Sequence, residues 1–331
     1  MKKTGRYRFQ VLFISVLMIG AASLLRAQSI PKVQPSDSAR SCDLSSALAF
    51  DLRMSDCENR WVVLPKKPGD DSHAYGYIYI DPTAGFTLYV GGGFKLDAAG
   101  KYQSMPNPLM PRSFTLIDKE GKKQEYPTNA VQMRMRLREN GIVSALPRDA
   151  LAQLGLSDTP EWISHYEDKS SSAVHAVNWG RLYNGFGDSA RALSYLEPVF
   201  REQPQARGLI FELAYAYNAL GRFGDAVALV TSISEQDRKN PNLCKELAFS
   251  YLSTKRFREA KEWYLYCLSI EQSTVLVRSE MAFNLSQAYR QLGDGENCKQ
   301  WMSKAREWAP QGSHLDRRLK QQPQMEQACG S

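Results

Sequence analysis

The segment Leu213-Ala214-Tyr215-Ala216-Tyr217 is followed 34 residues later by Leu247-Ala248-Phe249-Ser250-Tyr251. The same step in the other direction leads to Trp179-Gly180-Arg181-Leu182-Tyr183, and a fourth copy, displaced by four further residues, is Leu285-Ser286-Gln287-Ala288-Tyr289. In every copy a small residue stands three positions before a tyrosine. A fixed period of this length predicts stacked supersecondary units, each of which buries its apolar face against the next.

The second half of each unit keeps the same step. Small residues recur at Ala192, Ala226, Ala260 and Cys298, and glycines suited to tight turns stand at Gly187, Gly221 and Gly293. At these residues the chain resembles the tetratricopeptide repeat family, whose unit is a 34-residue pair of helices. The resemblance implies a helical solenoid of about four helix pairs, at 173–206, 207–240, 241–274 and 279–312.

Three features depart from the family pattern. Trp179 takes the place of the usual leucine, and Arg238 and Gln272 stand where the two middle units would end in proline. Four extra residues also precede the last unit. These departures reduce the regularity of the array without removing its period.

The resemblance also implies where a partner would bind, because the first helices of successive units line the concave face of such an array. Aromatic and amide residues there suit a protein or an extended peptide segment. The candidate residues are Asn178, Arg181, Asn184, Phe211, Tyr215, Asn218, Lys245, Phe249, Phe283, Gln287 and Arg290. The alternative is that Phe211, Phe249 and Phe283 only fill gaps between units.

Short β-prone runs separated by turn sequences fill residues 60–146, which predicts an antiparallel β-rich domain. A helical connector is expected at 147–172 and a cap and tail at 313–331. The predicted fold class is therefore α+β, with a β-rich domain followed by the all-α solenoid.

Three patterns in the β-rich part have two interpretations each. Alternate tyrosines within 75–79 form either a face that stacks on a glycan or other small ligand, or a buried core. The glycines at 91–93 suggest a phosphate loop, but a bulge or a flexible hairpin is favoured because no Lys-Ser or Lys-Thr pair follows them. Arginines at alternate positions of 134–138 form either a charged patch or an ordinary exposed sheet face.

The first 27 residues have the layout of a secretory signal peptide, with four basic residues at the start, an uncharged apolar run and a small residue at Ala27. A retained anchor is the alternative, but the apolar run is short for a bilayer span. Residues 28–59 are expected to form a leader. Without the signal, which holds five basic residues and no acidic one, the net charge of +7 becomes +2, so no nucleic-acid partner is predicted. We expect an exported protein of the periplasm or cell envelope, or a secreted one, with no membrane span in the mature chain.

Export would allow disulfides to persist among the six cysteines. Cys42 and Cys57 are a candidate pair. Cys267 and Cys298 fall on buried repeat positions, where the preferred interpretation is that they are small apolar fillers.

No catalytic constellation, cofactor motif or metal-ligand spacing is recognisable, since the four histidines are scattered and no C-x-x-C occurs. The preferred hypothesis is a non-enzymatic scaffold that mediates protein–protein interaction. An enzyme whose acid–base pair is assembled from distant strands is the least favoured alternative. The sequence does not determine whether the chain forms a homo-oligomer.

Overall fold

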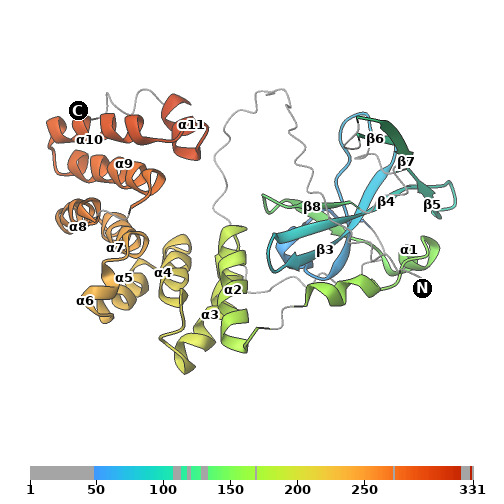
Figure 1. The fold of residues 1–331 in the computed structure, drawn as a ribbon, viewed down its shortest axis with the longest axis horizontal. Helices are drawn as coiled ribbons and strands as arrows, with labels where there is room; N and C mark the ends of the chain where they lie inside the picture. The colour runs from blue at the N-terminus through green and yellow to red at the C-terminus, as the bar shows by residue number, and fades with distance from the viewer. Residues whose placement is uncertain are drawn as a thin grey trace, which may run out of the picture. The chain divides into compact units, whose positions relative to one another are not determined.

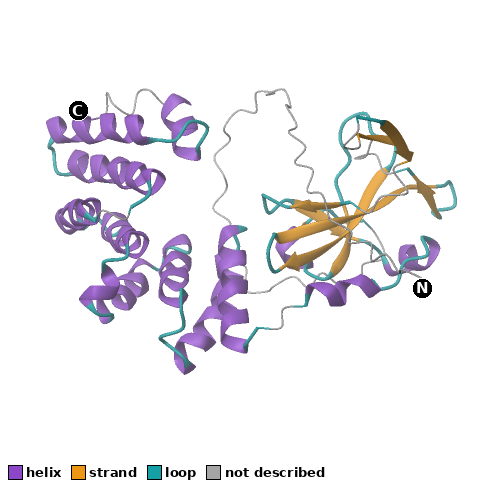
Figure 2. Ribbon diagram, in the orientation of Figure 1, coloured by secondary structure: helices purple, strands orange, loops and turns teal. Residues whose placement is uncertain are grey.

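The computed structural model describes residues 48–106, 113–117, 121–127, 133–167, 170–270, 273–321 and 329. Strands occupy the first part of this range and helices the second (Figures 1 and 2), which confirms the predicted α+β class. The predicted signal peptide and most of the predicted leader lie outside the described residues. None of the described helices is both long and apolar enough to cross a bilayer.

The described strands form one antiparallel sheet of seven strands and a separate hairpin. The sheet order is β1-β9-β2-β3-β4-β5, and β8 also pairs with β4. The strands of the sheet are β1 Leu52–Arg53, β2 Arg60–Val63, β3 His73–Asp81, β4 Gly85–Leu96, β5 Tyr102–Met105, β8 Arg134–Arg136 and β9 Ile142–Ala145. The hairpin consists of β6 Ser113–Ile117 and β7 Lys123–Pro127. A short 3-10 helix, η1 (Met54–Cys57), links β1 to β2.

The glycine run is a β-bulge, which is one of the two structures favoured from the sequence. Tyr75 pairs with Gly92 and Gly76 pairs with Val90, which leaves Gly91 as the extra residue of β4. A Cβ atom on Gly91 would lie 2.6 Å from Cε2 of Tyr75. Glycine is therefore required because an aromatic ring lies directly on the bare backbone.

One face of the sheet carries an aromatic core. Tyr75, Tyr77 and Tyr79 are 6%, 1% and 0% exposed and pack with Trp61 and Phe94. Helix α1 (Arg148–Gln153) and the 3-10 helix η3 (Glu161–Tyr166) supply further residues of this core. The hypothesis that the tyrosine row stacks on a glycan is therefore wrong, since the rings lie under these two helices.

The repeats are present as helix pairs (Figure 1). The paired helices are α2 Ser172–Gly185 with α3 Ser189–Glu202, α4 Leu209–Ala219 with α5 Phe223–Ser232, α7 Pro241–Ser253 with α8 Phe257–Ser269, and α9 Val275–Gln291 with α10 Gly295–Trp308. A single turn, α6 (Glu235–Arg238), precedes the third pair and was not predicted. The predicted cap is α11 (His314–Gln321), which buries Leu315 and Leu319.

The small residues allow the paired helices to pack closely, as the repeat pattern predicts. A Cβ on Gly180 would lie 2.4 Å from Cδ2 of Leu196, so α2 and α3 approach more closely than a side chain would allow. The equivalent Ala214, Ala248 and Ser286 have no exposed surface. Gly187, Gly221 and Gly293 have positive φ, but the third turn uses Lys255 at φ 63°.

The interpretation of Cys267 and Cys298 as unpaired fillers is wrong. Cys244 of α7 forms a disulfide with Cys267 of α8, and Cys298 of α10 forms one with Cys329. The physical reason for the first bond is the antiparallel helix pair, in which the start of the first helix lies beside the end of the second. The expected burial is correct, since Cys267 and Cys298 are 0% exposed.

Cys57 is also buried. Its candidate partner Cys42 lies outside the described residues, so that disulfide stays a prediction.

Candidate functional site

A cavity of about 310 Å³ opens on the first helices of the repeats. Four helices line it: α4, α7, α9 and the cap α11. We call this cavity the groove. Its lining residues are Tyr215, Asn218 and Ala219 of α4, Lys245, Glu246 and Phe249 of α7, Glu280, Phe283 and Asn284 of α9, and His314, Leu315 and Arg318 of α11.

Five of the predicted partner-binding residues meet in the groove: Tyr215, Asn218, Lys245, Phe249 and Phe283. The other predicted residues do not line it, and their role stays a prediction; they are Asn178, Arg181, Asn184, Phe211, Gln287 and Arg290. Sequence reasoning missed the carboxylates and the contribution of α11. The recurrence of glutamate at 212 and 246, one repeat period apart, was the signal available for the carboxylates.

Two buried amide–carboxylate pairs join neighbouring repeats. Asn184 Nδ2 donates to the main-chain oxygen and to Oε2 of Glu212, both at 2.9 Å. Asn218 repeats this arrangement with Glu246 at the same distances, and its Oδ1 accepts from Ser250 Oγ at 2.7 Å. Burial raises the pKa of Glu212. These two asparagines therefore fix the stacking of the repeats, and their amide nitrogens are already engaged.

Lys245 lies between two carboxylates on the groove wall. Its Nζ is 2.8 Å from Glu280 Oε2 and 3.6 Å from Glu246 Oε1. Burial by itself would lower the pKa of Lys245, but the charges of Glu246 and Glu280 outweigh this and raise it. Lys245 is therefore a charged residue that is already paired.

Three aromatic side chains, Tyr215, Phe249 and Phe283, also line the groove. Phe249 packs edge-on against Phe223, with ring centroids 6.2 Å apart. The guanidinium of Arg318 lies over the ring of Phe283, 4.9 Å from its centroid. Tyr215 remains 38% exposed. The groove thus offers aromatic surface with a cation held on it, which suits an extended peptide bearing both apolar and polar side chains.

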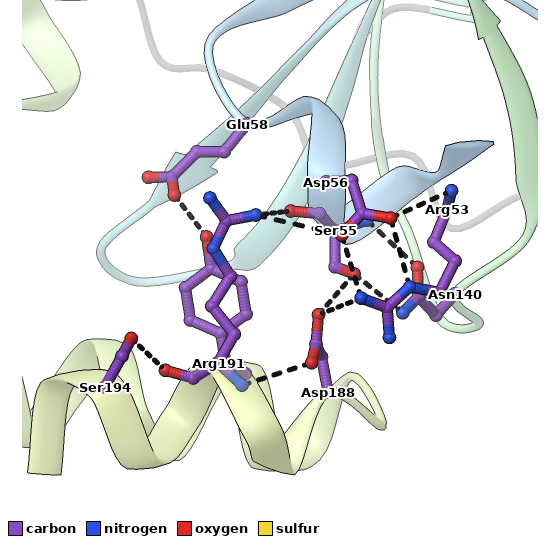
Figure 3. A network of polar contacts seen from close by, with 9 residues as sticks. Arg53, Ser55, Asp56, Glu58, Asn140, Asp188, Arg191 and Ser194 are labelled. Atoms are coloured by element: carbon purple, nitrogen blue, oxygen red, sulfur yellow. Dashed lines mark hydrogen bonds and ion pairs between the residues drawn. The ribbon is translucent and has the colours of Figure 1, made fainter. Parts of the chain in front are cut away.

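A second cluster of polar side chains joins the β-sheet to the first repeat (Figure 3). At its centre is Asp188, whose side chain is 1% exposed and caps the start of α3 by accepting from Arg191 N. Ser55 Oγ donates to Asp188 Oδ2 at 2.7 Å, and Arg53 pairs with the same oxygen at 3.2 Å. Arg191 reaches back to the main-chain oxygen of Ser55 at 2.8 Å.

Glu58 makes the second polar link of this interface. Its carboxylate accepts from Trp179 Nε1 at 3.1 Å and from the hydroxyl of Tyr183. Burial, reinforced by the nearby Glu58, raises the pKa of Tyr183. Beside this link, Phe86 of β4 stacks on Phe186 with ring centroids 4.2 Å apart. Trp179, which replaces the usual leucine of the repeat, therefore forms part of the contact with the sheet.

Family models of the tetratricopeptide repeat match residues 185–243 and 279–311. These matches, with the helix pairs described above, show that the C-terminal half of the chain consists of tetratricopeptide repeats. Neither model extends into the β-sheet region. A search of curated proteins finds no match.

Solved repeat proteins resemble the array only loosely. MamA AMB-1 is 20% identical with a TM-score of 0.37, and the match covers 44% of this chain and 85% of that one. A thermophilic TPR protein from Thermus thermophilus is 18% identical with a TM-score of 0.39, covering 48% of this chain and 84% of that one. The assignment of the repeats therefore rests on the family models and on the helix pairs themselves.

Proposed function

We propose that this protein is an exported, non-enzymatic adaptor whose groove binds an extended segment of a partner protein. The observation that carries the proposal is the groove itself, because four helices converge on one cavity whose lining includes Tyr215, Phe249 and Phe283. Its volume of about 310 Å³ is at the lower end of the range for sites that enclose a small ligand. A few side chains of a peptide would fill it.

The chemistry of the groove supports a peptide more than a small metabolite. Its charged groups are spread over three helices, and Lys245 is already paired with two glutamates. Among the described residues, no three His, Cys, Asp or Glu side chains gather as metal ligands would. Binding would therefore depend on aromatic contact, with the charges setting the orientation of the segment.

Two features support export. The first is the signal-peptide layout of residues 1–27. The second is the pair of disulfides, one within the third repeat and one between the last repeat and the tail, because such bonds persist in oxidising compartments and are rare in the cytosol. Cell fractionation with N-terminal sequencing tests this point. A mature chain that begins near Gln28 is expected, and an intact Met1 in the cytosolic fraction would contradict it.

Site-specific crosslinking in living cells tests the groove. A photoreactive phenylalanine analogue replaces either Tyr215 in the groove or Tyr266 on α8, which are 38% and 37% exposed. We expect position 215 to capture a defined partner and position 266 to capture none. Equal capture at both positions, or no discrete product at position 215, would refute the assignment of the groove.

A matched substitution gives a second measurement. Phe249→Ala should remove aromatic surface from the groove and reduce the crosslink yield from position 215. The matched change Tyr266→Ala should leave that yield unchanged. A yield that falls equally in both variants would point to a general loss of stability instead of a groove contact.

A further inference from the structure

Among the described strands, none pairs with one of the two edges of β8. The strand pairs with β4 along its other side, where Val90 N donates to the oxygen of Met133 and Leu137 N donates to the oxygen of Phe86. Main-chain groups alternate in direction along a strand, so those of Arg134 and Arg136 point away from β4. Within the described part of the chain, no strand pairs with β8 on that side.

The side chains of the same stretch carry positive charge that no described carboxylate pairs with. Arg134, Arg136 and Arg138 are all exposed. No carboxylate of a described residue forms an ion pair with any of them. Lys245, Arg222 and Arg256 of the repeats, by contrast, all have acidic partners.

One of these arginines is held in place. The Arg134 guanidinium lies 5.1 Å from the ring centroids of both Trp162 and Tyr166 in η3. Stacking on two aromatic rings fixes the position of the group but leaves its hydrogen-bond donors available to an anion. The first arginine is therefore preorganised.

We propose that the free edge of β8 binds an extended acidic segment of a partner protein, which adds to the sheet as a further strand. Alternate residues of a strand are about 6.6–6.8 Å apart, so acidic side chains at every second position of the segment would lie opposite Arg134, Arg136 and Arg138. Free main-chain groups and a matching row of charge on the same edge favour a peptide over other polyanions. This site is separate from the groove and does not depend on it.

Binding of short peptides to the whole chain tests the proposal. The probe is a fluorescent, end-blocked peptide of four Glu-Thr repeats, and its control has glutamine in place of every glutamate. By fluorescence anisotropy we expect the glutamate peptide to bind about tenfold more tightly than the glutamine one, and the difference to shrink as salt is added. Equal binding of the two peptides would overturn the proposal.

Charge reversal locates the site. The double variant Arg136→Glu/Arg138→Glu leaves the stacked Arg134 in place and should weaken binding of the glutamate peptide about tenfold. The matched variant Arg207→Glu/Lys299→Glu changes the net charge equally at exposed repeat positions and should bind as the unmodified protein does. Equal losses in both variants would show a general charge effect and overturn the assignment to β8.

The strand geometry has its own test, which requires no protein variant. N-methylation of alternate amides of the peptide removes main-chain donors and should abolish binding, while methylation of the other set should preserve it. Binding that survives both methylations, with dextran sulfate competing as well as the peptide, would mean a simple anion patch and would refute strand addition.

Discussion

The contact between the sheet and the first repeat gives the most quantitative prediction, through the substitution Asp188→Ala. Asp188 caps α3 and accepts from Ser55 Oγ at 2.7 Å, and its side chain is 1% exposed. Loss of the cap costs about 1 kcal/mol. Leaving the fully buried Ser55 hydroxyl without its carboxylate acceptor costs about 1–3 kcal/mol more.

The ion pair with Arg53 adds little, since the Arg53 side chain is 46% exposed. We therefore expect Asp188→Ala to lower the free energy of unfolding by about 2–4 kcal/mol. Urea denaturation followed by far-UV circular dichroism measures this change.

Asp294 supplies the matched control. It caps α10 in the same way, accepting from Asn297 N at 3.1 Å, and its second hydrogen bond comes from the side chain of the same asparagine. The destabilisation by Asp294→Ala should therefore reflect the loss of a cap alone and be clearly smaller than the destabilisation by Asp188→Ala. If the two substitutions destabilise equally, the contact with Ser55 contributes nothing and the reasoning is refuted. A double-mutant cycle of Ser55→Ala with Asp188→Ala should show coupling of about 1–2 kcal/mol.

Three further predictions concern single sites in the repeats. Asn184 Oδ1 is buried without a partner among the described residues, whereas the equivalent atom of Asn218 accepts a hydrogen bond from Ser250. Ala216 stands at the position equivalent to Ser250. Ala216→Ser should therefore raise the free energy of unfolding, measured by urea denaturation, by about 0.5–1 kcal/mol. No gain would show that the hydroxyl does not reach Asn184. Lys255 has a φ of 63°, so Lys255→Gly should raise stability by about 0.5–1 kcal/mol, and a loss would mean that the lysine side chain makes a compensating contact. Burial raises the pKa of Glu212 above its usual 4.5, so the folded state binds a proton more readily than the unfolded state. The stability of the protein should therefore fall as pH rises from 4.5 through the raised pKa. Glu212→Gln should remove this part of the pH dependence in thermal melts. An unchanged pH profile in that variant would contradict the assignment.

The repeat half of the fold could be predicted because its determinants are local and periodic. Gly180 and Ala214 recur one period apart, and each contact they allow lies within a helix pair or between neighbours. The strands were located less accurately. The glycines at 91–93 separate two β-prone runs in the sequence, at 86–90 and 94–96, but the structure joins both runs in the single strand β4, because these glycines are a bulge in a continuous strand and not a turn.

The features that sequence reasoning missed depend on contacts between segments without a shared period. The pairing of Cys244 with Cys267 follows from the geometry of a helix pair, which residue type alone does not reveal. Helix α11 was predicted as a cap. It lies outside the repeats, so the repeat period does not show which side of α9 it covers. The presence of Arg318 in the groove was therefore not predicted from the sequence.

The position of the sheet limits how the repeats can grow. A repeat array ordinarily presents an apolar flank at each end, on which another unit, or the end of a second molecule, can stack. Here Phe86 and Glu58 occupy the flank formed by Phe186, Tyr183 and Trp179. Duplication of a repeat ahead of α2 would therefore have to displace a folded sheet, whereas insertion between later repeats would not. No repeat can therefore be added before the first one without displacing the sheet. Any change in the number of repeats during evolution is expected further along the chain.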